Sequence, residues 1–195
     1  MVALKVEADA KKKRQKRHMR NAVLLTVGAV GLIAVAAIAP NAVRLLETTG
    51  INARLRYQTK TVLGRLKQDG EIEFVERDGK SYARLTKKGR RTLALHREKL
   101  RLQEPRRKRW DKRYRLIIFD VPEKRKRVRE RIRREFQEAG FLRIQDSAWI
   151  YPHDCEAFIA LLKAELHIGR DVLYVVIESI EGDARIRKHF NLPPK

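Results

Sequence analysis

Y-R-L-I-I-F-D-V-P-E, residues 114–123, decides the fold of the second half of the chain. The apolar residues of a predicted β-strand run up to one carboxylate, Asp120, and Pro122 then prevents the strand from continuing. Four basic residues, 124–127, follow and open a charged helix. A single acid at the end of a buried strand is either a metal ligand or a cap of the following helix. These two interpretations separate a nuclease from a DNA-binding regulator.

The segments around this stretch repeat one pattern of strands and helices. We expect a strand at 114–121, a helix at 124–139, strands at 141–146 and 147–151, a helix at 154–166 and a strand at 171–179. The order βαββαβ predicts a ferredoxin-like domain at 114–195, with a four-stranded antiparallel sheet and two helices on one face. A closing segment, 185–192, is interpreted as a short helix that packs back or as a dimer contact.

The first half of the chain predicts a winged helix-turn-helix domain at 21–103. Helices are expected at 21–39, 41–47 and 58–68. Alternating strands at 72–77 and 80–85 flank Asp78-Gly79, a two-residue hairpin turn, and Thr86 caps a further helix. The alternative for this domain is a winged-helix module for dimerisation or protein contacts. Together the two halves predict an α+β fold.

An apolar segment without charge at 22–43 allows a second interpretation. Its length would suit a membrane span, and the basic residues before it would also suit a signal peptide. The segment is rich in Ala, Val and Gly, and Gly28, Gly31 and Pro40 interrupt it, which favours a buried first helix. We therefore expect a cytoplasmic protein. The alternative is a membrane anchor at 22–43 with the C-terminal part in the cytoplasm.

The charge of the chain indicates a polyanionic partner. The 195 residues carry a formal net charge of +22, with a pI near 10.7. The basic residues gather in a tail at 1–20 and again at 86–113, which includes a predicted linker at 104–113. Duplex DNA is the first expected partner and RNA the second. The single cysteine, Cys155, excludes an internal disulfide and a cysteine-based zinc finger.

The predicted DNA contacts lie on the third helix, on the wing and in the linker. They are Lys60, Thr61 and Arg65 on the helix, Arg77 and Lys80 on the wing, and Arg106, Arg107, Lys108 and Arg109 in the linker. His153 and Cys155, two residues apart, could be read as a base and a nucleophile, but the surrounding sequence has no pattern typical of acyl transfer. Cys155 is instead expected to be a small packed residue. No sequence pattern indicates a pocket for a small effector.

Two stretches carry a family resemblance. F-D-V-P-E-K-R-K-R-V-R-E-R-I at 119–132 and G-F-L-R-I-Q-D-S-A-W-I-Y-P at 140–152 resemble the C-terminal domain of PaaX-family repressors, the phenylacetate-degradation type. That domain is in turn similar to Cas2, a dimeric ferredoxin-like CRISPR-associated subunit. The resemblance covers residues 110–192 and, with the winged helix ahead of it, implies a dimeric DNA-binding transcriptional regulator.

The Cas2 side of the resemblance implies two alternatives. Asp120 stands where the Cas2 family carries a proposed metal-binding acid, which would make it a catalytic and magnesium-binding residue of an endoribonuclease or endodeoxyribonuclease. The sequence gives no reason to place Asp146, at a predicted turn, or Asp154, at a predicted helix start, beside Asp120. A non-catalytic adaptation subunit, or a membrane-tethered nucleic-acid adaptor, is the other alternative. No cofactor is expected except magnesium in the nuclease case.

Overall fold

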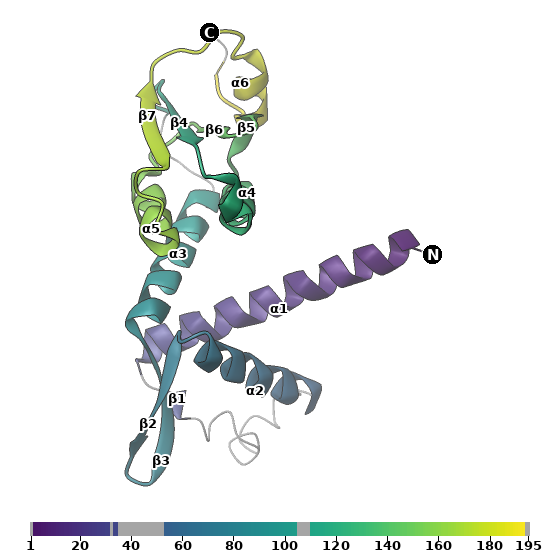
Figure 1. The fold of residues 1–195 in the computed structure, drawn as a ribbon, viewed down its shortest axis with the longest axis vertical. Helices are drawn as coiled ribbons and strands as arrows, with labels where there is room; N and C mark the ends of the chain where they lie inside the picture. Colours follow the sequence, from purple (N-terminus) through teal and green to yellow (C-terminus); the bar gives the residue numbers. More distant parts are fainter. Residues whose placement is uncertain (1, 32, 35–52, 105–109, 194–195) are drawn as a thin grey trace. The chain divides into compact units, whose positions relative to one another are not determined.

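The computed structural model describes residues 2–31, 33–34, 53–104 and 110–193. The chain divides into two compact units, Met1–Leu93 and Ala94–Lys195 (Figure 1). Each unit combines helices with one antiparallel sheet, so the protein is of the α+β class, as the sequence predicts.

The first unit is built from helices and a three-stranded sheet. Its elements are α1 (Val2–Val30), β1 (Ile33–Ala34), α2 (Ala53–Gln68), β2 (Ile72–Arg77), β3 (Lys80–Leu85) and the beginning of α3 (Lys87–Gln103). The strands follow the order β1-β3-β2, and both neighbouring pairs are antiparallel. The predicted hairpin is present, and Asp78 and Gly79 both have positive φ in its two-residue turn.

The first helix differs from its prediction at 21–39. α1 begins at Val2, so the predicted basic tail is helical from there, and it ends at Val30. Gly31 then has a φ of +77°, and Ile33–Ala34 pairs with the edge of β3 instead of extending the helix. The tertiary contact with β3 therefore overrides the apolar helical pattern. The predicted helix at 41–47 lies outside the described residues.

The described part of the apolar segment belongs to the core of the first unit. Leu24 and Val27 of α1 are fully buried. They share one cluster with Val62, Leu63, Leu66, Ile72, Ala83, Leu85 and Leu93. Within the described ranges, none of the helices combines the length and the apolar character that a membrane span requires.

Glu71 joins α1, β2 and α3 within the first unit. Its buried carboxylate accepts hydrogen bonds from Arg20 and, at 3.3 Å, from Thr92 Oγ1. Burial raises the pKa of this carboxyl above its ordinary value of 4.5. Thr86 caps α3, because its Oγ1 accepts the N–H of Gly89 at 3.1 Å. A Cβ at Gly89 would lie 1.9 Å from the Glu71 carbonyl oxygen, so this close approach requires glycine.

The second unit has the six strands and helices that the sequence predicts. Its elements are the end of α3, β4 (Tyr114–Phe119), a 3₁₀ turn η4 (Glu123–Arg125), α4 (Lys126–Ala139), β5 (Leu142–Gln145), β6 (Ala148–Tyr151), α5 (Glu156–Leu166), β7 (Val172–Ile177) and α6 (Ala184–Phe190). The strands form one sheet in the order β5-β6-β4-β7, and each neighbouring pair is antiparallel.

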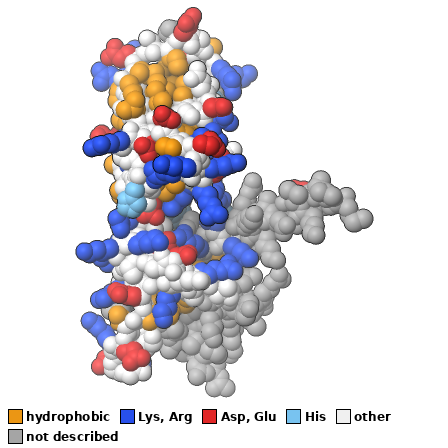
Figure 2. All heavy atoms as spheres, in the orientation of Figure 1, with side chains coloured by type: hydrophobic (Ala, Val, Ile, Leu, Met, Phe, Trp, Pro, Cys, Tyr) orange, Lys and Arg blue, Asp and Glu red, His pale blue; other side chains and the backbone are white. Residues whose placement is uncertain are grey.

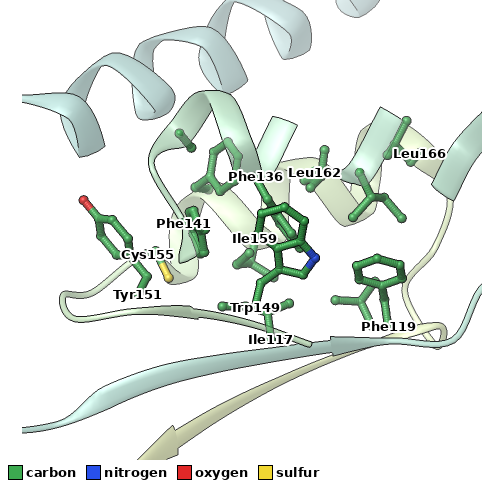
Figure 3. Packing of buried hydrophobic residues seen from close by; sticks show 14 of the residues in the cluster. Ile117, Phe119, Phe136, Phe141, Trp149, Tyr151, Cys155, Ile159, Leu162 and Leu166 are labelled. Carbon is green, nitrogen blue, oxygen red and sulfur yellow. The ribbon is translucent and has the colours of Figure 1, made fainter. Parts of the chain in front are cut away.

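An aromatic cluster fills the space between one face of this sheet and the helices α4 and α5 (Figure 3). Phe136 of α4 lies at its centre, fully buried. The rings of Phe141, Trp149, Phe119 and Phe158 lie 5.0, 5.6, 6.2 and 6.4 Å from the Phe136 ring. Aromatic contacts of this kind contribute beyond the area they bury, so Phe136 is a main source of stability in this unit.

The C-terminal half of α3 packs in the second unit, although the sequence predicts residues 94–103 as part of the winged-helix domain. Lys99 is buried and its Nζ donates to Glu135 at 2.6 Å and to Glu138 at 2.9 Å, both on α4. Tyr151 donates its hydroxyl hydrogen to the Leu102 carbonyl at 2.7 Å. Breaking such a buried ion cluster by removing one partner is costly, so it fixes this half of α3 to α4.

The predicted C-terminal helix, α6, covers part of the opposite face of the sheet. The Tyr114 hydroxyl of β4 donates to Asp183 Oδ2 at 3.0 Å, and Arg187 Nε donates to the same oxygen at 2.7 Å. Burial, together with this hydrogen bond, raises the pKa of Tyr114 to about 12. The guanidinium of Arg187 also lies over the Trp110 ring, 5.0 Å from its centroid.

Replacement of the central aromatic ring should destabilise the second unit. We expect Phe136→Ala to lower its free energy of unfolding by about 3–5 kcal/mol, because a cavity replaces four ring contacts. Both tryptophans of the chain, Trp110 and Trp149, lie in the second unit, so urea unfolding followed by tryptophan fluorescence measures this unit. Gln137→Ala, at the exposed neighbouring position of α4, is the control and should change the value by less than about 0.5 kcal/mol.

Candidate nucleic-acid interface

α2 presents one apolar and one polar face. Val62, Leu63 and Leu66 are buried in the core of the first unit. Arg65 is exposed, and Thr61 is half-buried. The side chain of the predicted contact Lys60 lies outside the described residues. The helix therefore holds Arg65 at the solvent, where a phosphate or a base edge can reach it.

The tip of the wing carries two further cations. Arg77 and Lys80 are directly opposite each other in the β2–β3 register, on either side of the turn, and both are exposed. Further along the hairpin, Arg84 donates to Glu73 at 2.8 and 3.0 Å, so that pair is internally neutralised. Among the described residues, neither Arg77 nor Lys80 forms an ion pair, and the exposed acids Glu76 and Asp78 stand beside them at the same tip.

The remaining predicted contacts, Arg106, Arg107, Lys108 and Arg109, lie outside the described residues. After them, Arg115 donates two hydrogen bonds to Asp111, at 2.8 and 2.6 Å, and this contact holds the pKa of the Asp111 carboxyl below its usual value. The two residues anchor the start of β4 to the segment that precedes it.

α4 carries basic residues of two kinds. Arg129, Arg131 and Arg133 form ion pairs with Glu123, Glu165 and Glu130, respectively. By contrast, the exposed Lys126, Arg127 and Arg134 have no ion pair with any residue that the structure describes. The sequence pattern predicts a single charged face on this helix. The tertiary contacts show which of its arginines are paired with glutamates and which cations, Lys126, Arg127 and Arg134, are exposed without an ion pair among the described residues.

Asp120 lies at the end of β4, and its side chain is exposed. Its backbone N–H donates to the Asp171 carbonyl at 2.8 Å, and the N–H of Phe119 donates to Ser147 at 3.0 Å. These bonds bring the end of β4 beside the start of β7 and the β5–β6 turn. The turn residue Asp146, which the sequence gave no reason to place near Asp120, therefore lies at the same end of the sheet.

The acids at this end of the sheet do not form a metal site within one protomer. Asp171 is paired with Arg125 at 3.0 Å, and Asp146 is paired with Arg143. Among the described residues, no group of three or more His, Cys, Asp or Glu side chains could hold a metal ion. In the described part of one protomer, two of the acids at this end of the sheet are thus already engaged by arginines.

The structure describes no hydrogen bond from a backbone N–H of η4 or α4 to the Asp120 carboxylate, as a helix cap would require. η4 begins after Pro122 and α4 after Arg125, and neither helix start has a side-chain cap. Within the described residues the Asp120 carboxylate makes no hydrogen bond or ion pair. Its exposed position leaves the carboxylate accessible to a ligand from the solvent.

The nucleophile hypothesis for residues 153–155 does not suit the packing. Cys155 is fully buried in the aromatic cluster. Asp154 Oδ1 accepts the N–H of Glu156 at 3.1 Å, at the start of α5. A thiol enclosed in the core cannot reach a substrate, so Cys155 acts as a packed residue.

The comparison with protein families agrees with this geometry. Residues 107–188 match the family model of the PaaX protein central Cas2-like domain. The matched range runs from the segment before β4 into α6 and so covers the whole four-stranded sheet. No curated protein matches the chain.

Substitution of Asp120 should separate a structural from a functional role. Because the carboxylate has no partner among the described residues, we expect Asp120→Asn to change the free energy of unfolding of the second unit by less than about 0.5 kcal/mol. A helix cap would instead lose about 0.5–2 kcal/mol. Asp171→Asn, which removes the ion pair with Arg125, is the matched comparison and should cost up to about 1 kcal/mol in urea unfolding.

Proposed function

We propose, on the premise that this is a PaaX-family protein with a Cas2-like domain, that the chain is a dimeric DNA-binding transcriptional regulator. The first unit binds duplex DNA as a winged helix-turn-helix, and the second unit, a ferredoxin-like domain, carries the dimer contact. As a regulator of transcription it acts in the cytoplasm, on chromosomal DNA.

The arrangement of the first unit supports the winged-helix assignment. A short strand, β1, lies between α1 and α2 in the sequence and pairs with the returning strand of the hairpin. α2 immediately precedes the hairpin, which is the position of a recognition helix relative to its wing. An α-helix fits the major groove of B-DNA, while a hairpin beside it can contact phosphates or the minor groove.

The position of three exposed cations in the first unit is the observation that carries the proposal. Arg65 on α2 and the Arg77–Lys80 pair at the wing tip are exposed in one unit. In a chain of net charge +22, these groups supply the phosphate contacts that dominate DNA affinity. The sequence predicts further DNA contacts by Lys60 and Thr61 of α2 and, separately, by the linker residues Arg106, Arg107, Lys108 and Arg109.

The second unit supports a ferredoxin-like assignment through its order of elements. Two strand–helix–strand units interlock, so that β4 and β6 are the central strands and β5 and β7 the edges. A two-fold dimer of this domain would present two winged helices to two half-sites of a palindromic operator.

Removing two of the exposed cations should weaken DNA binding. We expect Arg65→Ala combined with Lys80→Ala to raise the dissociation constant for a labelled duplex at least about tenfold. The plot of log affinity against log salt should become shallower by about 1.8, because two phosphate contacts are lost at about 0.9 each. Fluorescence anisotropy across a salt series measures both quantities.

The control for this experiment has the same loss of charge in the other unit. Arg185→Ala combined with Lys188→Ala removes two exposed cations of α6. Equal effects of the two double variants would show that total charge, and not the α2–wing surface, drives binding, and would contradict the proposed interface.

The nuclease alternative rests on Asp120 alone, and the same duplex tests it, together with single-stranded RNA. We expect both nucleic acids to remain intact with magnesium and with chelator, for the wild type and for Asp120→Asn. Shortened products that require magnesium and disappear in Asp120→Asn would favour the nuclease over the regulator.

A further inference from the structure

The helix α1 is anchored in the first unit by its C-terminal half. Among the described side chains, the first of this helix to join the hydrophobic core is Met19, which is partly buried, and Leu24 is fully buried. Arg20, at the same level, pairs with the buried carboxylate of Glu71. Figure 1 shows that α1 continues from this anchor toward the N-terminus as one helix, away from α2 and the hairpin. We call residues 2–18 the arm of the first unit.

The local sequence of the arm favours a helix without a packed face. Residues 7–18 contain no glycine, proline or β-branched residue, and alanine, lysine, arginine and glutamine are strong helix formers. Glu7 and Asp9 stand four positions before Lys11 and Lys13, the order of acid and base that stabilises a helix. The helical backbone of this range is therefore consistent with its own sequence.

The second half of the arm has an excess of positive charge. Residues 11–20 contain seven Lys and Arg and no acid. The side chains of Lys16 and His18 are exposed. Positions three or four apart are neighbours on an α-helix, so this run places like charges at neighbouring positions, which destabilises the helix. A partner with closely spaced negative charges removes this repulsion, and a nucleic acid is such a partner.

The composition of the arm favours duplex DNA as that partner. Helices that lie on a membrane surface present Trp, Phe or Leu on an apolar face, and residues 7–18 contain no apolar residue larger than alanine. A continuous basic helix fits the major groove of B-DNA. The major groove of duplex RNA is deep and narrow, and protein side chains cannot read it. The width of the groove therefore favours DNA over RNA.

We propose that the arm is a second DNA-binding element, which lies in the major groove of the duplex that the first unit binds and contacts phosphates there. At about 1.5 Å per residue the arm is about 25 Å long, so it reaches phosphates over about seven base pairs. This element rests on the proposed function, because it contacts the same duplex as α2 and the wing. Contacts with phosphates position the protein and add affinity without reading the sequence.

Removing two cations of the arm should weaken DNA binding. We expect Lys12→Ala combined with Lys13→Ala to raise the dissociation constant for the labelled duplex at least about tenfold, and to make the plot of log affinity against log salt shallower by about 1.8. Alanine keeps the helix. The control is Arg185→Ala with Lys188→Ala in the second unit, where Figure 2 shows cations intermixed with acids. This control should leave both quantities close to those of the wild type.

A proline in the arm distinguishes a helical element from a charged tail. Gln15→Pro keeps every cation but removes a backbone hydrogen bond and breaks the helix. We expect this variant to raise the dissociation constant at least about fivefold, because the cations no longer follow the groove. Gln15→Ala is the matched control and should bind as the wild type does. Thermal unfolding followed by circular dichroism checks that each variant keeps the folded units.

The outcomes separate the arm from the proposed function. Wild-type affinity in the Lys12–Lys13 variant, with weaker binding by Arg65→Ala combined with Lys80→Ala, would overturn the arm and leave the winged-helix assignment standing. Equal affinities of Gln15→Pro and Gln15→Ala would show that charge acts without the helix, which contradicts docking in the groove. Tighter binding of the wild type to vesicles of phosphatidylcholine and phosphatidylserine than to the duplex would assign the arm to a membrane surface instead. A wild type that binds no duplex would contradict both proposals.

Discussion

The central strand β4 imposes the main constraint on the second unit. It pairs with β6 on one side and β7 on the other, and other elements have to cover its apolar side chains on both faces of the sheet. Ile117 and Phe119 point into the aromatic cluster under α4 and α5. On the opposite face, Tyr114 is covered through its hydrogen bond to Asp183 of the α6 region. Only the last residues of that face, near Ile118, remain exposed. The need to cover this second face of β4 thus explains the position of α6, and Ile118 is exposed because that cover does not reach the end of the strand.

The basic residues of the chain have two different physical roles. In α4 and its neighbours, arginines such as Arg125, Arg129 and Arg131 are held by nearby carboxylates and contribute to tertiary contacts. On α2 and at the wing tip, Arg65 and Arg77 are exposed and have no such partner among the described residues. Net charge alone indicates a polyanionic partner, but the ion pairs determine where the positive potential remains available.

The sequence predicts the second unit well because its signals are local. The apolar stripe of α4, with Ile132 and Phe136, and the strand before Asp120 have clear periodicity, and Gly140 ends the helix with positive φ. The structure differs from these local expectations where tertiary contacts decide. β1 is two residues long, too short to show alternation, and the end of α3 joins the second unit through the contact of Lys99 with α4. Likewise, the ion pairs that engage Asp171 with Arg125 and Asp146 with Arg143 cannot be inferred from spacing.

The complete burial of Cys155 gives the chain a built-in chemical reporter. A thiol at the start of α5, closed off by the aromatic cluster, reacts with a labelling reagent only when the second unit opens. Since it is the one cysteine of the chain, a cysteine engineered at an exposed position could be modified selectively in the native protein. The rate of modification at position 155 would, in turn, report the opening free energy of the aromatic cluster without any mutation.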